Sequence, residues 1–216
     1  MGCILAIDTA SPEIGIALSV DGQISEWSGR VRRGAESVLG KALSEMLEKA
    51  PPVEGVVVSV GPGSFTSLRV GVATALGVAF ASGCKVLPVC SLKARAVGRP
   101  GRVMAILDGR KGRAYASVFV DGQPVSEAVD LPPEEALLLA DGEPFSAVGE
   151  GAEVWAEEVR AAGGELVENP TASPASRLVA LFGQSEEELV SPDAVSLRYL
   201  RAPDAKLPKD SPARGA

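Results

Sequence analysis

The sequence predicts an α/β protein with a duplicated fold of two lobes, each with a mixed sheet and flanking helices. In two stretches, an Asp ends an apolar strand and the letters VDGQ follow with a second Asp thirteen residues after the first. Asp8 is followed in this way by Asp21, and Asp108 by Asp121, at an offset of one hundred residues. Asp-Gly between apolar runs predicts a hairpin. Helices and strands then alternate after each hairpin, as in α/β folds.

The first copy reads as an antiparallel meander followed by alternating helices and strands. Alternating apolar residues predict the meander strands. The helix that follows them carries an apolar stripe on one side. The predicted elements are strands over 3–10, 13–20, 23–31 and 53–61 and helices over 35–50 and 66–82.

The second copy has the same order of elements with different lengths. Helices are predicted over 131–140, which begins with prolines, and 152–163, and strands over 165–169 and 194–201. This duplicated plan is that of the actin-like ATPase fold, also called the ribonuclease H-like fold. Glycines and a proline in VGRPGR mark the boundary. The predicted parts are an N-terminal lobe over 1–99, a C-terminal lobe over 100–200 and a flexible tail over 201–216.

Composition excludes many kinds of catalyst. The chain has no histidine, so it cannot build a Ser-His-Asp triad, a Cys-His pair or an HExxH zinc site. Three cysteines without a CxxC pair predict neither a disulfide framework nor a zinc centre. The longest uncharged run, Val70–Cys84, is fifteen residues long, against the roughly 20 of a membrane helix. We therefore expect a cytoplasmic protein with no membrane contact and no metal of its own.

Basic residues gather in one part of an acidic chain. The net charge of −7 makes the surface as a whole repel nucleic acid. Between Lys93 and Arg113, however, there are seven basic residues and a single acidic one, Asp108. This segment is either a solvated face with salt bridges or an anion or RNA contact. The predicted RNA contacts are Arg95, Arg99, Arg102, Arg110 and Lys111.

Two carboxylates, one in each half, end the first strand of that half, at the positions where actin-like kinases bind phosphate and metal. In those enzymes the two hairpins cradle phosphates, and a carboxylate at the end of the first strand holds the metal. Asp8, Thr9 and Asp108 are therefore candidates for a vestigial phosphate site. Strand-end Asp residues are also ordinary turn formers, and that alternative stays open.

The segment GPGSFT, residues 61–66, raises the question of a phosphate loop. It lacks the GK[ST] ending of a Walker A sequence, although backbone amides at a helix start can hold an anion. The helix after it indicates close packing instead, because small residues recur every four positions. The two rows are Ser67, Gly71, Ala75 and Ala79, and Ala73, Gly77 and Ala81.

Either the chain's own sheet or a helix of another chain could pack on these rows. The helix over 35–50 carries larger apolar side chains, each worth roughly 1.5–3 kcal/mol when buried. A lobe of about 100 residues offers little to cover both helices, so a partner chain would complete the burial. The predicted interface residues are Val38, Leu39, Ala42, Leu43, Met46, Ser67, Gly71, Ala75, Val78 and Ala79.

Four segments, in order, resemble one known family. They are ILAIDTA, GPGSFTSLRVGVATALGVAFASG, AILDGRKGRAYASVF and RYLRAPDAKLP. Together they resemble TsaB, the YeaZ-type subunits of the bacterial tRNA threonylcarbamoyladenosine machinery, over nearly the whole chain. GPGSFT with Leu68, Arg69 and Gly71 is the most specific part. The sequence differs from the family at Gly34, where His is common, and at Ser67, where Gly is common.

The resemblance implies a non-catalytic member of the glycoprotease-like branch of the actin-like fold. Such subunits pair with TsaD, which carries the metal and transfers threonylcarbamoyl to the adenosine 3′ of the anticodon in ANN-reading tRNAs. TsaE, a small ATPase, joins that pair, so ATP and metal belong to the partners and tRNA is met only within the complex. The implied pairing face contains the helices over 35–50 and 66–82, and isolated chains form homodimers through it. A chain without histidine gives no support to the peptidase name of the wider family.

Two other functions stay open from the sequence. A stand-alone actin-like ATPase or kinase would use Asp8 as metal ligand, with Asp108 or the VGEGA turn near the nucleotide. Against it, the second half has only Gly149 and Gly151 in place of an extended Gly-rich adenosine loop. A free-standing RNA-binding module would use the basic segment, against a repulsive overall charge and with only two Tyr, two Trp and five Phe to stack bases.

Overall fold

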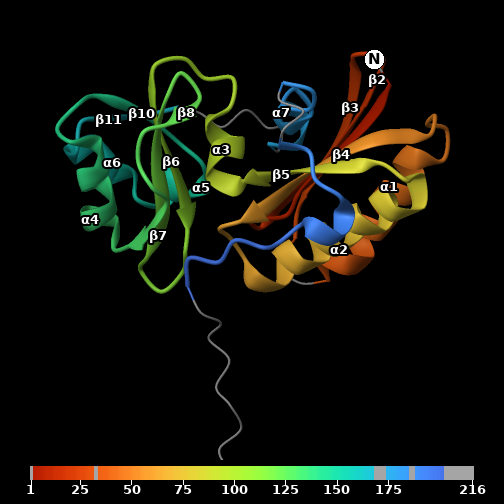
Figure 1. Cartoon of the computed structure of the whole chain (residues 1–216). Helices are drawn as coiled ribbons and strands as arrows, with labels where there is room; N and C mark the ends of the chain where they lie inside the picture. The colour runs from red at the N-terminus through yellow and green to blue at the C-terminus, as the bar shows by residue number, and fades with distance from the viewer. Residues whose placement is uncertain (1, 32–33, 168–173, 185–187, 202–216) are drawn as a thin grey trace, which may run out of the picture.

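Two mixed sheets lie side by side and form the framework of the protein (Figure 1). The computed structural model describes residues 2–31, 34–167, 174–184 and 188–201. Helices pack on the faces of each sheet, and one short helix, α3 (Ser91–Ala96), lies between the two. The predicted α/β architecture of two lobes is confirmed.

The N-terminal sheet has five strands in the order β3-β2-β1-β4-β5. β1, β2 and β3 form the antiparallel meander, whereas β1, β4 and β5 run parallel because helices connect them. The predicted strands and helices of this half are confirmed with small shifts at their ends. They are β1 (Cys3–Asp8), β2 (Glu13–Val20), β3 (Gln23–Arg30), α1 (Ala35–Leu47), β4 (Val53–Gly61), α2 (Phe65–Ser82) and β5 (Lys85–Cys90).

The C-terminal sheet repeats this topology. Its order is β11-β10-β6-β7-β8, so an antiparallel meander of β6, β7 and β8 again continues into parallel strands. A further strand, β9, pairs with β7. The elements are β6 (Arg102–Asp108), β7 (Ala114–Val120), β8 (Gln123–Pro124), β9 (Val129–Leu131), α4 (Pro133–Leu137), η1 (Leu138–Ala140), β10 (Phe145–Val148), α5 (Glu150–Val154), α6 (Ala156–Ala161) and β11 (Gly164–Leu166).

The two VDGQ sequences form the same turn in both lobes. The φ angles are 51° at Asp21 and 87° at Gly22, and 49° at Asp121 and 81° at Gly122. Two consecutive residues with positive φ are typical of the type I′ turn, whose twist matches that of the flanking strands. The hairpin signal in the sequence therefore identified the duplication correctly.

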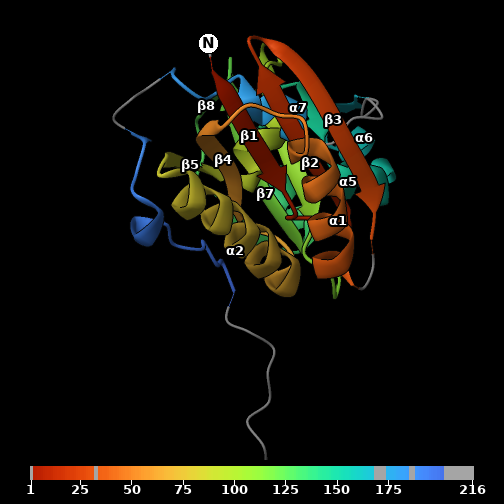
Figure 2. The same cartoon turned by 90° about the vertical axis from the view of Figure 1, so that its right-hand side faces the viewer.

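Helices cover both faces of the N-terminal sheet. α1 and α2 pack beside each other on one face, in front of the strands in Figure 2. α7 (Ala175–Val179) packs on the opposite face, against β1 and β2. The central strands are therefore covered on both sides, which explains their nearly continuous apolar runs.

The chain returns to the first lobe near its end. Residues 97–101 connect α3 to β6, at the glycines and proline that predict the boundary. The prediction that residues 100–200 all belong to the second lobe is wrong, because α7 covers the N-terminal sheet and Val190 bridges to Val86 of β5. Apart from Arg201, the tail predicted over 201–216 lies outside the described residues.

Two predicted elements differ from the structure. The helix expected over 152–163 is divided into α5 and α6 by Trp155, whose φ of −113° is not helical. Residues 194–201 are not a strand. After η3 (Pro192–Ala194), this segment packs on one lobe through Val195 and Leu197 and on the other through Leu200, instead of following one sheet edge. The strand predicted over 165–169 is β11, and its last two residues lie outside the described part.

By length and composition alone, one described helix, α2, could cross a membrane. The core helix of a soluble protein passes the same test, and α2 packs along β4 and β1. Five of its eighteen residues are buried, and these are Leu68, Gly71, Val72, Ala75 and Ala79. α2 is therefore buried on one side only.

Gly71 has a packing reason within the chain. A Cβ atom at this position would lie 2.1 Å from Thr9 Oγ1. The Thr9 hydroxyl donates a hydrogen bond to the Ser67 carbonyl at 2.8 Å, which draws the end of β1 close to the first turns of α2. At Gly77, by contrast, a Cβ atom would meet nothing within 4 Å apart from the neighbouring backbone of its own helix. Gly71 is thus needed for the chain's own packing, and Gly77 is not.

We expect Gly71→Ala and Gly77→Ala to change stability in opposite directions. The first overpacks the contact with Thr9 and should cost about 1–3 kcal/mol. The second replaces an unconstrained helical Gly and should add up to about 1 kcal/mol. Urea unfolding of the two variants measures both effects. Equal changes in the free energy of unfolding would contradict the conclusion that the contact with Thr9 requires glycine at position 71.

Candidate functional site

A cleft of about 330 Å³ opens between the two lobes, beside the start of α2. One wall consists of residues 10–12 after β1 and residues 62–66, which lead into and begin α2. The opposite wall is the β6–β7 turn at residues 108–111, and residues 198–201 also line the cleft. The loops that follow Asp8 and Asp108 therefore face each other across it.

Next to this cleft, Asp8 is paired with an arginine of the same chain. The Asp8 side chain is fully buried, and Arg95 of α3 is 4% exposed. Arg95 Nη1 donates a hydrogen bond to Asp8 Oδ1 at 3.2 Å, and Nη2 lies 3.1 Å from Oδ2. Arg95 Nε lies 3.8 Å from Oε2 of Glu150, the first residue of α5. One guanidinium therefore connects β1 of the first lobe to α5 of the second.

Burial and charge act in opposite directions on this network. Burial lowers the pKa of Arg95, but the carboxylates of Asp8 and Glu150 outweigh it, so the pKa is raised and the guanidinium stays charged. Burial raises the pKa of Glu150 above its ordinary value, although Arg95 and a hydrogen bond with Ser11 oppose this shift. Glu150 lies farther from the Arg95 guanidinium than Asp8 does, so its ion pair with Arg95 is the weaker of the two.

The residues predicted as a vestigial phosphate site all have structural partners. Asp8 faces Arg95, and Thr9 is buried and bonds to α2. Asp108 Oδ1 accepts a hydrogen bond from the Arg110 amide at 2.7 Å, which is the turn-forming role that the sequence left open. Among the described residues, no group of three or more His, Cys, Asp or Glu side chains is placed to hold a metal ion.

The glycines of the GPGSFT loop serve close backbone packing. A Cβ atom on Gly61 would lie 2.2 Å from the Arg198 carbonyl oxygen, and one on Gly63 would lie 2.3 Å from that of Ala10. The Ser64 amide donates a hydrogen bond to the same Ala10 carbonyl at 2.8 Å. The loop is thus held against its own chain, and its glycines do not require a phosphate to explain them.

The mouth of the cleft carries a cluster of aromatic and cationic side chains that the sequence analysis missed. Phe65 and Tyr199 have ring centroids 4.9 Å apart. The Arg69 guanidinium carbon lies 3.7 Å from the Phe65 ring centroid, and Arg69 Nε donates a hydrogen bond to Tyr199 Oη at 3.2 Å. Arg69 and Tyr199 are 130 positions apart, so no local pattern could pair them.

Residues 198–201 hold both lobes at this cleft. The Arg198 amide donates a hydrogen bond to the Val60 carbonyl at 2.7 Å, at the end of β4. Arg201 donates hydrogen bonds to the Gly109 carbonyl and to Tyr115 Oη, and its Nε lies 3.3 Å from an Asp130 oxygen. The segment therefore joins the first lobe to the second.

The five predicted RNA contacts do not form one patch. The prediction is wrong for Arg95, which is buried in the ion network. Arg99 is half-buried and donates to the Arg95 carbonyl at 3.2 Å, while Arg102 donates to the Ala140 carbonyl at 3.1 Å. Arg110 and Lys111 are exposed and line the cleft. They are separated from Arg102 by the length of β6, roughly 20 Å.

The predicted interface residues divide between the core and the surface of α1 and α2. For six of them the prediction of a direct partner contact is wrong, because these side chains are buried against the chain's own sheet and helices. These six are Leu39, Ala42, Leu43, Gly71, Ala75 and Ala79. Val38 is exposed, and Met46, Ser67 and Val78 are partly exposed. The outward side of α2, called here the outer α2 face, consists of Ala73, Gly77, Phe80 and Ala81.

Comparisons with known proteins agree with this architecture. A family model described as TsaD, tRNA N6-adenosine threonylcarbamoyltransferase, matches residues 31–180. The tRNA threonylcarbamoyladenosine biosynthesis protein TsaB of Bacillus subtilis is 32% identical over 146 residues, 64% of this chain and 63% of that protein. The chain belongs to the family of this TsaD model, and its relatives include proteins named TsaB.

Other similarities of this chain cover more of its length. An uncharacterised protein of Mycobacterium bovis is 32% identical over 94% of this chain and 93% of its own length. A Mycobacterium leprae protein is also 32% identical, but the chain spans only 56% of it. A crystal structure titled YeaZ from Pseudomonas aeruginosa matches with a TM-score of 0.75 and 24% identity, over 93% of this chain and 100% of that one. This match shows the duplicated actin-like fold.

We expect Asp8→Asn to lower the free energy of unfolding by about 3–5 kcal/mol, because it leaves the Arg95 guanidinium buried without its main partner. Glu45→Gln is the matched control. It breaks an exposed ion pair with Lys41, 3.9 Å apart, and should cost less than about 0.5 kcal/mol. Denaturant unfolding of both variants measures the contrast. Similar losses would contradict the structural role of the Arg95 network.

The raised pKa of Glu150 predicts a pH-dependent stability. The folded state binds the Glu150 proton more tightly than the unfolded state, so this contribution is present below the ordinary pKa of 4.5 and is lost as pH rises through the raised pKa. Relative to Glu150→Gln, the natural chain should therefore lose stability between acid and neutral pH. Thermal unfolding at several pH values tests this, and a constant difference would contradict it.

Proposed function

We propose that this chain is a non-catalytic subunit that binds TsaD for threonylcarbamoyl transfer to the adenosine 3′ of the anticodon in ANN-reading tRNAs. TsaE would join through that pair in the cytoplasm, and ATP and metal would be used by the partner subunits. Relatives named as tRNA threonylcarbamoyladenosine biosynthesis proteins support the process. The observation that carries the non-catalytic assignment is the buried Arg95 beside Asp8.

Arg95 stands beside the carboxylate that would hold a metal in an actin-like kinase. A cation at 3.1 Å satisfies the charge of Asp8, and a second cation there would be repelled. The chain also has no histidine to serve as a general base or metal ligand. Both observations favour a binding subunit over a catalyst.

The outer α2 face supports helix-to-helix contact with a partner. Ala73, Gly77 and Ala81 are small and exposed, so another helix could approach closely, and Phe80 beside them is 61% exposed. Small residues around one large aromatic anchor are typical of a tightly packed interface. A second copy of the chain would use the same face, so homodimer and heterodimer would exclude each other.

We expect Phe80→Glu and Gly77→Glu to weaken pairing with the TsaD of the same organism at least tenfold while leaving the chain folded. A charge at Ala75 would be a poor test, because Ala75 is fully buried and the variant would unfold. Leu138→Glu is the control, since Leu138 is 75% exposed on the other lobe. Co-purification followed by native mass measures pairing. Full pairing of the Phe80 and Gly77 variants would refute the outer α2 face as the interface.

ATP binding by the isolated chain tests the non-catalytic assignment separately. With Arg95 against Asp8, calorimetric titration of the isolated chain with ATP and Mg²⁺ at millimolar concentration should show no saturable heat. Saturable binding that is lost in Asp8→Ala would instead support a stand-alone ATPase.

A further inference from the structure

We infer that the mouth of the cleft contacts a single-stranded stretch of tRNA. We call this surface the cleft mouth and define it by Phe65, Arg69, Arg110, Lys111, Arg198 and Tyr199. Its cations would meet the sugar-phosphate backbone, and its aromatic pair would meet an unstacked base. The inference rests on the proposed function, in which the chain works on tRNA.

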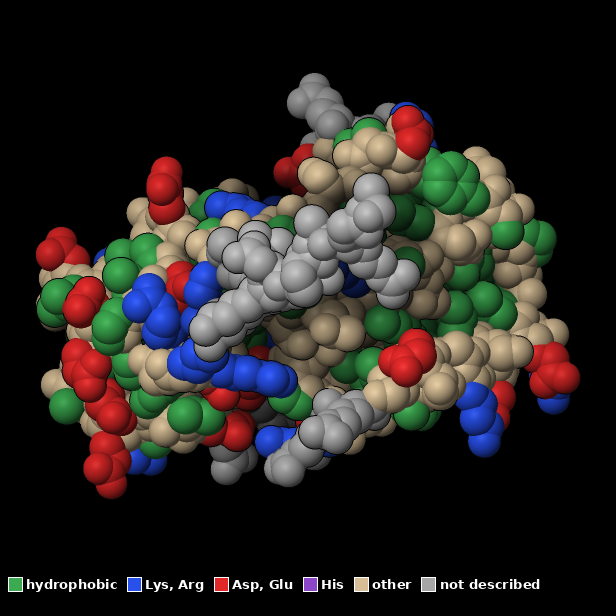
Figure 3. Space-filling model, turned by 90° about the horizontal axis from the view of Figure 1, so that it is seen from below, with side chains coloured by type: hydrophobic (Ala, Val, Ile, Leu, Met, Phe, Trp, Pro, Cys, Tyr) green, Lys and Arg blue, Asp and Glu red, His purple; other side chains and the backbone are tan. Residues whose placement is uncertain are grey.

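The charge at the cleft mouth is opposite to that of the chain. The whole chain has a net charge of −7, yet Arg69, Arg110, Lys111 and Arg198 are all exposed here. Among the residues that line the cleft, the one acidic residue is Asp108, whose Oδ1 already accepts from the Arg110 amide. Figure 3 shows Lys and Arg side chains gathered on the underside of the C-terminal lobe. A local basic surface on an acidic protein is the electrostatic signature of a nucleic-acid contact.

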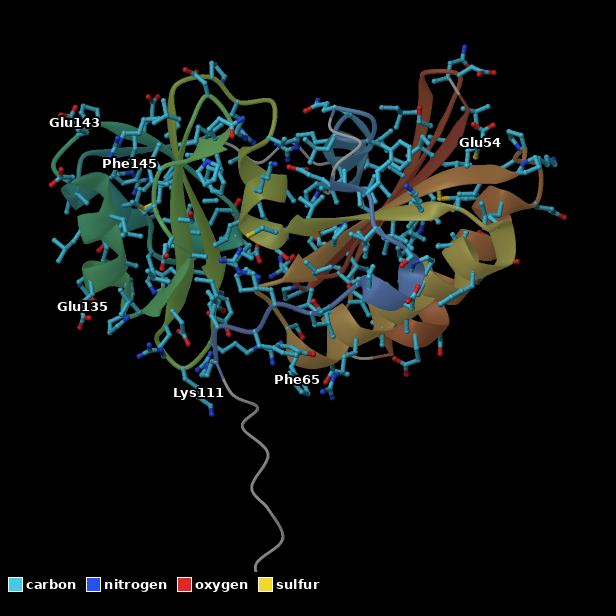
Figure 4. All side chains as sticks on the ribbon, viewed as in Figure 1. Glu54, Phe65, Lys111, Glu135, Glu143 and Phe145 are labelled. Carbon is cyan, nitrogen blue, oxygen red and sulfur yellow. The ribbon has the colours of Figure 1, made fainter. Side chains whose placement is uncertain are left out.

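Aromatic side chains distinguish this surface from a plain basic patch. Tyr199 is 38% exposed, and the ring of Phe65, beside it, is covered by Arg69. In Figure 4, Phe65 and Lys111 lie at the lower edges of the two lobes, on either side of the cleft. Proteins that bind single-stranded RNA stack unpaired bases on aromatic rings and on Arg guanidinium planes, next to cations that hold the phosphates. The cleft mouth combines these features.

The inner end of the cleft does not favour a free nucleotide as the ligand. There, Asp8 is paired with Arg95, and the glycines of the GPGSFT loop are packed against the Ala10 and Arg198 carbonyls. The exposed cations instead come from three separate segments, namely α2, the β6–β7 turn and residues 198–201. This arrangement suits a polymer backbone that crosses the opening. An acidic peptide would meet the same cations but would leave the aromatic pair unused.

The test compares two double variants with the same loss of charge. Arg110 and Lys111 have φ angles of 59° and 56°, which Asn tolerates well, so Arg110→Asn with Lys111→Asn removes both cations without adding strain. The control is Lys49→Asn with Lys85→Asn. Both lysines are exposed. Lys49 lies in the turn between α1 and β4, and Lys85 is the first residue of β5, so both are near the ends of those strands away from the cleft.

Binding of a fluorescent ANN-reading tRNA to the complex with TsaD is measured by anisotropy at several salt concentrations. We expect the Arg110/Lys111 variant to bind at least fivefold more weakly, with a salt slope smaller by about 1–2. The control should stay within twofold of the natural chain. Tyr199→Leu should also weaken binding several-fold but leave the salt slope unchanged, because it removes the exposed ring of the aromatic pair and no charge.

Three results would overturn the inference. They are unchanged affinity in the Arg110/Lys111 variant, an equal loss in the lysine control, and displacement of tRNA by ATP at the cleft. Co-purification of each variant with TsaD separates this inference from the proposed function. If pairing persists and tRNA affinity does not change, only the cleft mouth is refuted. If the natural chain does not pair, the proposed function fails, and the same titrations on the isolated chain still test the cleft mouth.

Discussion

The ion pair between Arg95 and Asp8 is the interaction on which the relative position of the two lobes depends. A guanidinium that is 4% exposed must keep its carboxylate partner, because an unpaired charge in the interior costs several kcal/mol. Arg95 also donates a hydrogen bond to the Ser91 carbonyl at 3.1 Å, which fixes its side chain to α3. With Glu150 on its other side, Arg95 holds the ends of β1, α3 and α5 together, and the loops that line the cleft extend from these elements.

The same network joins the two lobes through side chains of the chain itself. A cation of the chain stands next to Asp8, and residues 198–201 add contacts to Val60 on one lobe and Asp130 on the other. The inner end of the cleft is thereby closed by the chain itself. Its mouth stays open, and there the exposed basic and aromatic side chains remain accessible.

α2 has two sides with different uses. Its inward side needs Gly71 and Ala75 because Thr9 and the sheet lie against it. Its outward side has small residues without such a contact, and Gly77 has open space around it. Glycine on the exposed side of a helix lowers the stability of that helix, but it allows another helix to pack closely against it. The proposed subunit contact and the chain's own core therefore use opposite sides of one helix.

The sequence by itself determined the duplication, the hairpin turns, most element positions and the family, because these depend on residues close together in the chain. The VDGQ turns need only local backbone geometry, and the apolar stripe of α1 follows from helical periodicity. Only the tertiary structure decided which row of α2 is buried, that Arg95 is an internal cation and not an RNA contact, and that residues 194–201 cross both lobes. Periodicity shows that a helix has sides but not which side is covered. The environment of Arg95 depends on Asp8, 87 positions away, which no local pattern reveals.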